Sequence, residues 1–543
     1  MTTATTAVSP ERTTAREARD GFMQLVRSEW TKLRTVRGWI IGMVVAVLLT
    51  IAFGVLTATG GTIGCGGPSP SEQRTGAACR PTPPVGPDGE AVSDTFQFVH
   101  RPLSGDGTLT ARVISLTGLY SPAGILHVPP GAAVTPETAG MAPGTQPWSK
   151  AGILIKQSQT AGSAYAAMMV TGSNGVRMQN NYTYDTAGAP GTVSASSPRW
   201  LRLVRSGDKI SGYDSVDGTH WTAVDSVTLP GLPPTVQVGL FATSPNYMII
   251  NQSFGGSTAA GGPTVATGTF DDVAVQGSSS GGWTGDYMGT SKARAGELEL
   301  ASPFTHSGNT FTVTGSGDIA PLGGRGAGQA IEQGLVGVFA GLIAVGVVAA
   351  MFITAEYRRG LIRLTLAASP RRGRVLAAKA LVIGAATFVV GLVAAGVSMP
   401  LANHIYYDHG VYILPVSSLT EARVIVGTAA MFAAVAVFAL AVGTLLRRSA
   451  ATVTVVIVSV VLPYILAVAS VLPAGASEWL TRVTPAAAFA VEQSLVPYPQ
   501  VTAGYTPDQG YFPLSPWAGF AVLCGYALLA LGLAHLRLSR GDA

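Results

Sequence analysis

Charged residues are scarce in this sequence. Asp, Glu, Lys and Arg make up only 12% of its 543 residues, about half of the roughly 25% found in ordinary soluble domains. Hydrophobic residues make up 47%, and the mean hydropathy is +0.37. This balance excludes a wholly soluble protein and predicts segments that lie in a bilayer.

Two sequence motifs are also missing. No G-x-x-x-x-G-K-[ST] run occurs, so the chain does not bind nucleotide phosphates in the usual way, and any ATPase that drives it must be a separate chain. No H-E-x-x-H zinc motif occurs either. We therefore predict no catalytic residues and no directly bound nucleotide. The formal net charge of +5 needs no nucleic-acid partner, because arginines beside the apolar runs account for it.

The apolar residues are gathered into six runs, each near the roughly 20 residues that span a bilayer. The runs cover residues 38–58, 334–354, 380–401, 424–446, 451–471 and 517–536. They predict six transmembrane helices, which place both termini on one side. The runs contain almost no ionisable side chains, and this argues against a proton-coupled or ion-coupled carrier.

Lys and Arg gather in the short segments beside these runs. The loop 355–379 is the richest, with Arg358, Arg359, Arg363, Arg371, Arg372, Arg374 and Lys379 in or beside it. Further cations precede the first run, separate the fourth from the fifth, and follow the last: Arg27, Lys32, Arg34, Arg37, Arg447, Arg448, Arg537 and Arg540. Short loops with excess Lys and Arg stay cytoplasmic. We therefore predict a plasma-membrane protein with both termini inside and residues 59–330 outside.

The predicted outside region has a different sequence pattern, in which short runs of alternating apolar and polar residues are separated by residues typical of turns. It predicts an all-β domain, a sandwich or jelly roll, at 94–275. Candidate strands are 95–100, 108–116, 151–157, 165–170, 176–181, 200–205, 209–214, 221–224, 236–242 and 269–275. A Pro/Gly-rich collar at 59–93 precedes the domain, and a Gly/Ser-rich linker at 276–330 follows it. One further strand-like run at 310–314 either completes the sandwich or only tethers it.

The loop 355–379 resembles the segment between the second and third helices of ABC-2 type ABC-transporter permeases. That segment runs E-x-x-x-G, then Ser/Thr-Pro and a basic run, and Glu356, Gly360, Ser369 and Pro370 match it. Leu361 stands where the family often has Thr. The resemblance implies a permease subunit, an exporter, that forms a homodimer or heterodimer and is driven by a separate ABC ATPase. It implies that the loop contacts this ATPase through Glu356, Tyr357, Arg358, Arg359, Gly360, Ser369, Pro370, Arg371 and Arg372.

The segment before the first run is a basic amphipathic helix. Phe22, Val26, Trp30 and Leu33 recur at helical spacing, and the helix is expected to lie along the inner membrane surface. Residues 27–35 are similar to the interfacial elbow helix of many bacterial ABC-2 permeases, although an ordinary anchor helix would have the same pattern. Residues 478–493 likewise resemble the outer re-entrant segment of this family.

The outside domain resembles the concanavalin A-like, laminin-G-like jelly roll, through residues 148–153, 199–203, 212–221, 238–240 and 270–273. That resemblance allows a glycan or protein ligand, which Trp148, Trp200, Tyr213 and Trp221 would contact unless they only fill the core. It also allows Ca²⁺, for which the candidate ligands are Asp214, Asp217, Asp271 and Asp272, although Asp217 and Gly218 also read as a turn.

The three cysteines fall into two groups. Cys65 and Cys79 lie in the outside collar, where an oxidising exterior favours a disulfide between them, and Cys524 lies in the last apolar run. The chain as a whole is predicted to be an ABC-2 permease with an inserted β domain. The alternatives are a membrane-anchored receptor or glycan- or cell-wall-binding protein that works through that domain, and a glycan hydrolase on a membrane scaffold.

Overall fold

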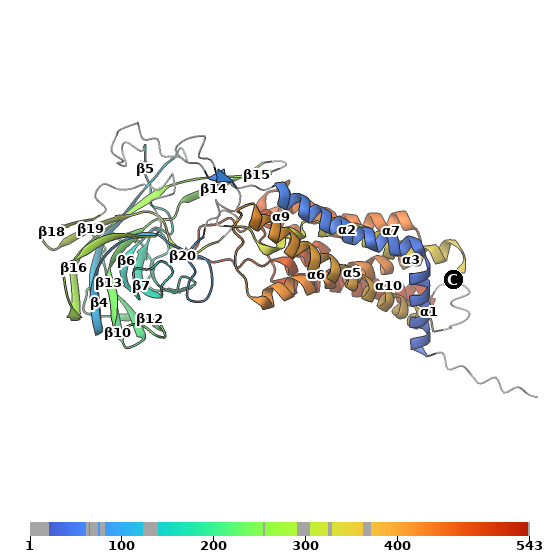
Figure 1. The fold of residues 1–543 in the computed structure, drawn as a ribbon, viewed down its shortest axis with the longest axis horizontal. Helices are drawn as coiled ribbons and strands as arrows, with labels where there is room; N and C mark the ends of the chain where they lie inside the picture. Colours follow the sequence, from blue (N-terminus) through green and yellow to red (C-terminus); the bar gives the residue numbers. More distant parts are fainter. Residues whose placement is uncertain are drawn as a thin grey trace, which may run out of the picture.

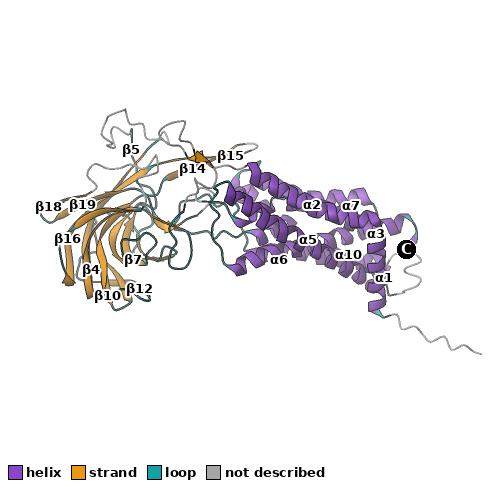
Figure 2. Ribbon diagram, in the orientation of Figure 1, coloured by secondary structure: helices purple, strands orange, loops and turns teal. Residues whose placement is uncertain are grey.

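The protein has two parts that lie end to end, a helical bundle and a β domain (Figures 1 and 2). The computed structural model describes residues 21–60, 64–65, 74–75, 82–122, 140–253, 256–289, 304–323, 328–361 and 371–540. From residue 21 the chain follows the bundle through α1 (Phe22–Thr35) and α2 (Arg37–Gly60), leaves it for the β domain, and returns for the remaining described helices. The β domain is therefore an insertion between the first and second long helices.

Six segments of the bundle are long and apolar enough to span a membrane, as the six runs predict. They are α2 (Arg37–Gly60), η4 (Ile331–Leu335) with α3 (Val338–Arg358), α5 (Arg372–Asp408), α6 (Ser418–Leu446), α7 (Ser449–Val456) with η5 (Ile457–Val461) and α8 (Leu462–Val468), and α10 (Pro516–Arg540). The fifth segment contains a π-helical turn at η5, just before Pro463. Because proline has no backbone N–H, the regular hydrogen-bond ladder is interrupted there.

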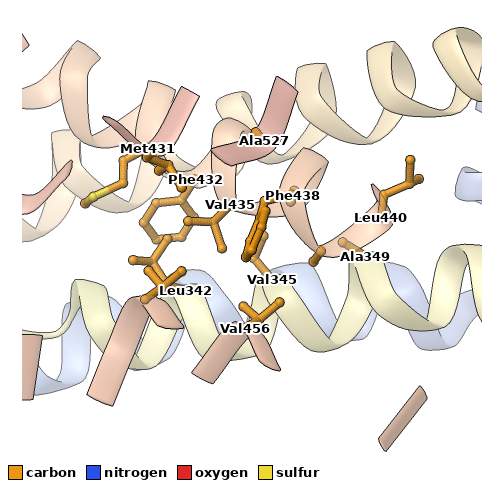
Figure 3. Close-up of a cluster of buried hydrophobic side chains, with 14 of the residues drawn as sticks. Leu342, Val345, Ala349, Met431, Phe432, Val435, Phe438, Leu440, Val456 and Ala527 are labelled. Carbon is orange, nitrogen blue, oxygen red and sulfur yellow. The ribbon is translucent and has the colours of Figure 1, made fainter. Parts of the chain in front are cut away.

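The segments α3 and α6 form the centre of the bundle. In both spans 67% of the apolar window is buried, against 17% for α2, which lies at the outside. Figure 3 shows their apolar side chains meeting, among them Leu342, Val345, Ala349, Met431, Phe432, Val435 and Phe438, with Val456 and Ala527 from two further helices. Small residues allow the close approach of the backbones: an added Cβ at Gly391 of α5 would lie 2.8 Å from Cα of Ala429 on α6.

Short helices fill the turn between the fifth and sixth spans. These are α9 (Ala474–Val483), η6 (Pro485–Glu492) and η7 (Pro507–Gln509). Figure 1 shows α9 at the end of the bundle that faces the β domain. Every residue of η6 is buried, and η6 lies against α10 and α6.

The β domain is built on one antiparallel sheet that curls round its own core, so the predicted all-β sandwich is confirmed. Its strands are β4 (Phe96–Tyr120), β5 (Ala142–Pro143), β6 (Lys150–Lys156), β7 (Tyr165–Thr171), β8 (Val176–Asn180), β9 (Tyr184–Ala187), β10 (Arg199–Ser206), β11 (Lys209–Ser215), β12 (Thr222–Thr228), β13 (Thr235–Thr243), β16 (Thr264–Ser279), β17 (Thr284–Met288), β18 (Phe304–Ser307) and β19 (Thr310–Gly315). Two-stranded pairs lie beside it: β1 (Gly64–Cys65) with β2 (Arg74–Thr75), β3 (Val92–Asp94) with β20 (Ile319–Pro321), and β14 (Tyr247–Ser253) with β15 (Gly256–Gly262).

The long strand β4 organises the sheet. Two strands were predicted here, at 95–100 and 108–116, but the chain bends at Gly105 (φ +71°) and continues as one strand. Its first half pairs with β13 and β17, and its second half with β10 and β16. Each half therefore belongs to a different part of the curled sheet.

The sheet also extends past residue 275. The strands β17 and β19 pair with β4 and β16, and Phe311 and Val313 of β19 are buried in the core. The strand-like run at 310–314 thus completes the sandwich. The strands β17 and β18 were not predicted, because the Gly/Ser-rich composition of this stretch hides the alternation of apolar and polar residues.

Hydrogen bonds that involve backbone groups connect the two parts of the protein. The side-chain Nε2 of the buried Gln500, in the loop after η6, donates hydrogen bonds to the carbonyl oxygens of Thr183 (2.9 Å) and Tyr182 (3.3 Å). Where the chain re-enters the bundle, Gln329 exchanges backbone hydrogen bonds with Tyr412 and Leu414 of the loop between α5 and α6. The β domain is therefore held to the bundle by loop residues at this end of the bundle as well as by its two linkers.

Candidate functional site

The candidate site lies at the end of the bundle that is remote from the β domain. There the helix α1 (Phe22–Thr35) runs across the ends of the long helices, and the C-terminal end of α10 lies nearby (Figure 1). Leu33 of α1 is buried in the main core of the bundle, and Leu25 packs against Val375 at the start of α5. The helix ends at Thr35, and the extended backbone of Val36 turns the chain into α2.

Four charged side chains meet where α1, the end of α3 and the start of α5 converge, and we call them the interhelix ion network. Lys379 Nζ donates to Glu29 Oε2 and to Glu356 Oε1, both at 2.7 Å. Lys32 Nζ donates to Glu29 Oε1 at 2.7 Å and to Glu356 Oε1 at 3.1 Å. Two lysines and two glutamates balance each other, so the network has no net charge.

Because three of its four side chains are buried, this network should stabilise the contact between α1 and the bundle. The side chains of Glu29, Glu356 and Lys379 are only 2%, 9% and 1% exposed, whereas Lys32 is 38% exposed. Removing one partner of a buried ion pair leaves a charge without compensation and costs about 3–5 kcal/mol. The network therefore fixes α1 to the two helices that flank the basic loop, although Glu29 and Glu356 are separated by most of the chain.

The predicted loop residues fall into buried and exposed groups. Glu356 belongs to the network, and the ring of Tyr357 lies 5.2 Å from the guanidinium of Arg447. Arg358 and Arg359 are exposed. Gly360 follows α3 with φ +67°, a left-handed conformation that favours glycine and accounts for the glycine of the E-x-x-x-G motif.

The far side of the loop is only partly described. Arg371 is exposed immediately before α5, and Arg372 Nη1 donates to the carbonyl oxygen of Leu538 at 2.5 Å. Ser369 and Pro370 lie outside the described residues, as does Arg363. Lys379, which the sequence groups with the loop cations, is instead buried within the bundle.

The four predicted elbow residues do not share one environment. Leu33 is buried and Val26 packs partly buried against the core, while Phe22 and Trp30 are 39% and 47% exposed. The face of α1 that meets the bundle includes Glu29, which the sequence interpretation missed. A signal was present, because Glu29 lies one turn before Leu33 and so falls within the apolar stripe.

Comparison with known families decides the class of the protein. The family model for ABC-2 family transporter proteins matches residues 182–543, about two thirds of the chain. The chain belongs to the ABC-2 transporter family. This confirms the resemblance inferred from Glu356, Gly360 and the basic loop, and it makes the chain a multi-pass membrane transport protein.

The other comparisons add little for this ABC-2 family member. No curated protein matches the sequence. Among solved structures, scytalido-glutamic peptidase is similar at 12% identity and TM-score 0.25, over 43% of this chain and 100% of that one. A functionally unknown protein from Saccharomyces cerevisiae has 14% identity and TM-score 0.22, over 37% and 84% of the two chains. The GH43 protein BlXynB from Bacillus licheniformis has 17% identity and TM-score 0.15, over 25% and 24%. Scores this low carry no argument about function.

The aromatic candidates in the β domain of this ABC-2 transporter already contact arginines. Trp200 and Trp221 lie 5.6 Å and 3.7 Å from the guanidinium groups of Arg112 and Arg202, and Tyr213 is directly opposite Arg202 in the sheet. Trp200 and Tyr213 therefore lie on the paired strands β10 and β11, and Trp221 immediately precedes β12. A sugar ring that stacked on the same face of either indole would have to displace an arginine.

Trp148 belongs elsewhere in the β domain. It is 9% exposed and lies 5.6 Å from the guanidinium of Arg177 on β8. It therefore does not join the other three aromatic residues.

The four candidate Ca²⁺ ligands have other partners or lie apart. Arg112 pairs with Asp271 and approaches Asp272, and Asp214 is buried. Asp217 accepts hydrogen bonds from the backbone N–H groups of His220 and Thr219, as in the turn reading. No group of three or more His, Cys, Asp or Glu that could hold a metal occurs among the residues that the structure describes.

The predicted disulfide remains a prediction. Cys65 pairs through its backbone with Arg74 in the two-stranded sheet of the collar, while Cys79 lies outside the described residues. Cys524 is free and partly buried on α10, as expected for the last span.

Proposed function

We propose that this chain is the permease subunit of an ABC exporter and that the interhelix ion network passes motion from a separate ATPase to the bundle. The observation that supports this proposal most directly is the contact of α1 with the end of α3 and the start of α5. One neutral, largely buried network connects α1 with both helices that flank the basic loop. ATP would be bound by the partner ATPase, since the chain has no phosphate-binding loop of the usual type.

The orientation proposed for the protein places this junction in the cytoplasm and the β domain outside. The start of α1 and the end of α10 lie at the same end of the bundle, opposite the β domain (Figure 1). Exposed cations also gather at the remote end, among them Arg358, Arg359, Arg371, Arg374 and Arg540. Their position agrees with the rule that short basic segments stay cytoplasmic.

The proposed mechanism uses the rigidity of the bundle centre. A push on the loop reaches the end of α3 and the start of α5 together, because Lys379 binds Glu356 across them. The apolar contacts between α3 and α6 would carry that displacement toward the outer loops. One six-span subunit provides half of a pathway, so a second permease, identical or different, would complete it.

The loop contact can be tested by reversing one charge. In Arg359→Glu, an exposed cation beside the proposed ATPase surface becomes an anion, and a co-expressed partner ABC ATPase should co-purify in smaller amount. Lys209→Glu is the matched control, because Lys209 is exposed on the β domain at the other end of the molecule. If both variants retain the ATPase at the parent level, with unchanged topology, the loop is not the coupling surface.

A further inference from the structure

An apolar groove lies between α2 and α3 at the end of the bundle crossed by α1. Its volume is about 630 Å³, which is within the usual range of small-ligand sites, roughly 300–1,000 Å³. Its walls are mainly apolar, with Val36, Trp39, Val45, Ala344, Val347 and Met351 among the lining residues. Val36, Val45 and Met351 are each about 40% exposed, at 41%, 39% and 39%, so no other part of the described chain covers them.

Two glycines of α2 shape this groove. A Cβ at Gly42 would lie 2.4 Å from Cγ2 of Val348 on α3, so the two helices touch at this level. One turn earlier, at Gly38, a Cβ would meet nothing within 4 Å. The helices therefore separate toward α1, and the groove widens in that direction.

Three cations line the wide end of the groove. They are Lys32, Arg358 and Arg359. The carboxylate there, Glu356, already accepts hydrogen bonds from Lys379 and Lys32 within the neutral ion network. Arg358 and Arg359 make no ion pair with any residue that the structure describes. The rim therefore has an excess of positive charge directly beside an apolar channel.

The length of the groove matches one leaflet of a bilayer. The stretch of α2 from Arg37 to Val45 rises about 12 Å at about 1.5 Å per residue, and the extended residue Val36 continues the groove toward α1. Half of a hydrocarbon core of about 30 Å is about 15 Å. An occupant that fits this space combines an anionic group at the membrane surface with an apolar chain about one leaflet long.

We propose that this groove binds one anionic phospholipid of the cytoplasmic leaflet. Its headgroup phosphate lies between Arg358, Arg359 and Lys32, and one acyl chain lies between α2 and α3. Charge complementarity at the rim selects an anionic headgroup over a zwitterionic one. This binding goes beyond the transport function and does not depend on the ATPase.

The proposal is tested with the full chain in lipid discs of phosphatidylcholine that contain a photoactivatable phosphatidylglycerol with a diazirine in its acyl chain. Cross-linked peptides should concentrate on residues 36–45 and 344–351. Unlabelled phosphatidylglycerol should compete with this labelling, and added phosphatidylcholine should not. In Ala344→Trp an indole fills the groove, and labelling of these peptides should fall roughly fivefold or more, because a packed indole leaves no room for a chain.

Matched variants separate the groove from the general lipid-facing surface. Val389→Trp adds the same indole at a 57% exposed position on α5 and should leave labelling of the groove unchanged. The double variant Arg358→Gln/Arg359→Gln should lose the preference for phosphatidylglycerol. Arg374→Gln/Arg540→Gln removes two exposed cations that do not line the groove, and it should keep the preference.

Three results would overturn the proposal. Labelling could be uniform over all exposed helix faces, or phosphatidylcholine could compete as well as phosphatidylglycerol. In the third, a Gly38→Cys variant would form a disulfide with a second copy of the chain, which would make the groove a contact between subunits. No ATPase is present in these experiments, so their failure leaves the permease proposal untouched.

Discussion

Two lysines, one in each part of the protein, show two ways of burying a charge. Lys156 in the β domain is fully buried, and so is its partner Asp94, at 2.9 Å. The amine also donates to the hydroxyl of Tyr182 and to the carbonyl oxygen of Ser163, at 3.0 and 3.1 Å. Lys379 in the bundle is as deeply buried, but its network ends in Lys32, which is 38% exposed. Solvent therefore reaches the network in the bundle through Lys32, but it does not reach the Lys156–Asp94 pair.

The difference concerns what each arrangement can do. Lys156 has one carboxylate partner, Asp94, and its other partners are neutral, so loss of that carboxylate leaves the buried charge uncompensated. In the bundle, each lysine contacts both glutamates, so α1 stays attached to α3 and α5 through small displacements in which every charge retains a partner. The comparison predicts that the β domain keeps one rigid structure, whereas the interhelix ion network allows small movements of the helices it connects. We call the network a joint in this sense.

The largest effect is expected where the pair is sealed. Asp94→Asn leaves the Lys156 amine without its carboxylate in a site where burial already lowers the pKa of Lys156 against the opposing effect of Asp94. The β domain should lose about 3–5 kcal/mol of stability. Pulse proteolysis of the full chain in urea measures this loss. The urea concentration at which half of the β domain is cleaved should be lower in Asp94→Asn than in the parent.

Two further variants sharpen that result. Asp286→Asn makes the same substitution in a pair with His100 whose carboxylate is 50% exposed, and it should cost no more than about 1 kcal/mol. In the double variant Asp94→Asn/Lys156→Met, removal of the stranded amine should recover part of the loss. A double variant no more stable than Asp94→Asn would mean that the buried charge is not the cause.

A smaller but still large effect is expected at the joint. Lys379→Met leaves Glu29 and Glu356 with Lys32 as their only cation in the network, and α1 should detach more often. A cost near 3 kcal/mol would speed opening-limited trypsin cleavage after Arg27 and Arg34 about a hundredfold. Inside-out vesicles make α1 accessible to the protease in the proposed orientation.

The control for this variant lies on the same helix. Arg374 is exposed and does not belong to the network, so Arg374→Met should be cleaved at the parent rate. Equal rates in Lys379→Met and Arg374→Met would show that the network does not hold α1 in place.

The features that sequence predicted best are those that repeat along the chain. The six apolar runs and the clusters of arginine can each be recognised from neighbouring residues alone. They correctly predicted the membrane-spanning segments and the family. Strand alternation likewise gave the all-β class. The boundary at residue 275 was less accurate, because the strands β17 to β19 lie in a Gly/Ser-rich stretch and gain their stability from pairing with β4 and β16.

The features that sequence could not predict depend on pairs of distant residues. Lys379 lies 350 positions from Glu29, and Lys156 lies 62 positions from Asp94. Each lysine alone reads as a surface charge, since lysines are almost never fully buried unless paired. Only Glu29 gave a local sign, a carboxylate within the apolar stripe of an amphipathic helix. The same limit applies to the groove, because the separation of α2 from α3 at Gly38 is set by packing.

The smallest effect is expected at the exposed end of the joint. Lys32→Gln removes a cation that is 38% exposed, and Lys379 still neutralises part of the charge on Glu29 and Glu356. Pairs that reach solvent contribute about 0–1 kcal/mol, so trypsin cleavage after Arg34 should accelerate no more than roughly fivefold. The effect should also be independent of pH in the neutral range. Burial lowers the pKa of Lys32, but the hydrogen bond to Glu29 and the charges of Glu29 and Glu356 together raise it further, so the net shift is upward.

A raised lysine pKa in the folded state means that the stabilisation is complete below the unfolded pKa, about 10.4, and is lost only as pH rises through the folded value. The ratio of cleavage rates between Lys32→Gln and the parent should therefore stay constant from about pH 6 to about pH 9. A ratio that changes within this window would show that another group in the network titrates there. An acceleration as large as that of Lys379→Met would show that the exposed and the buried lysine contribute equally, which would contradict the expectation that solvent contact weakens the contribution of Lys32.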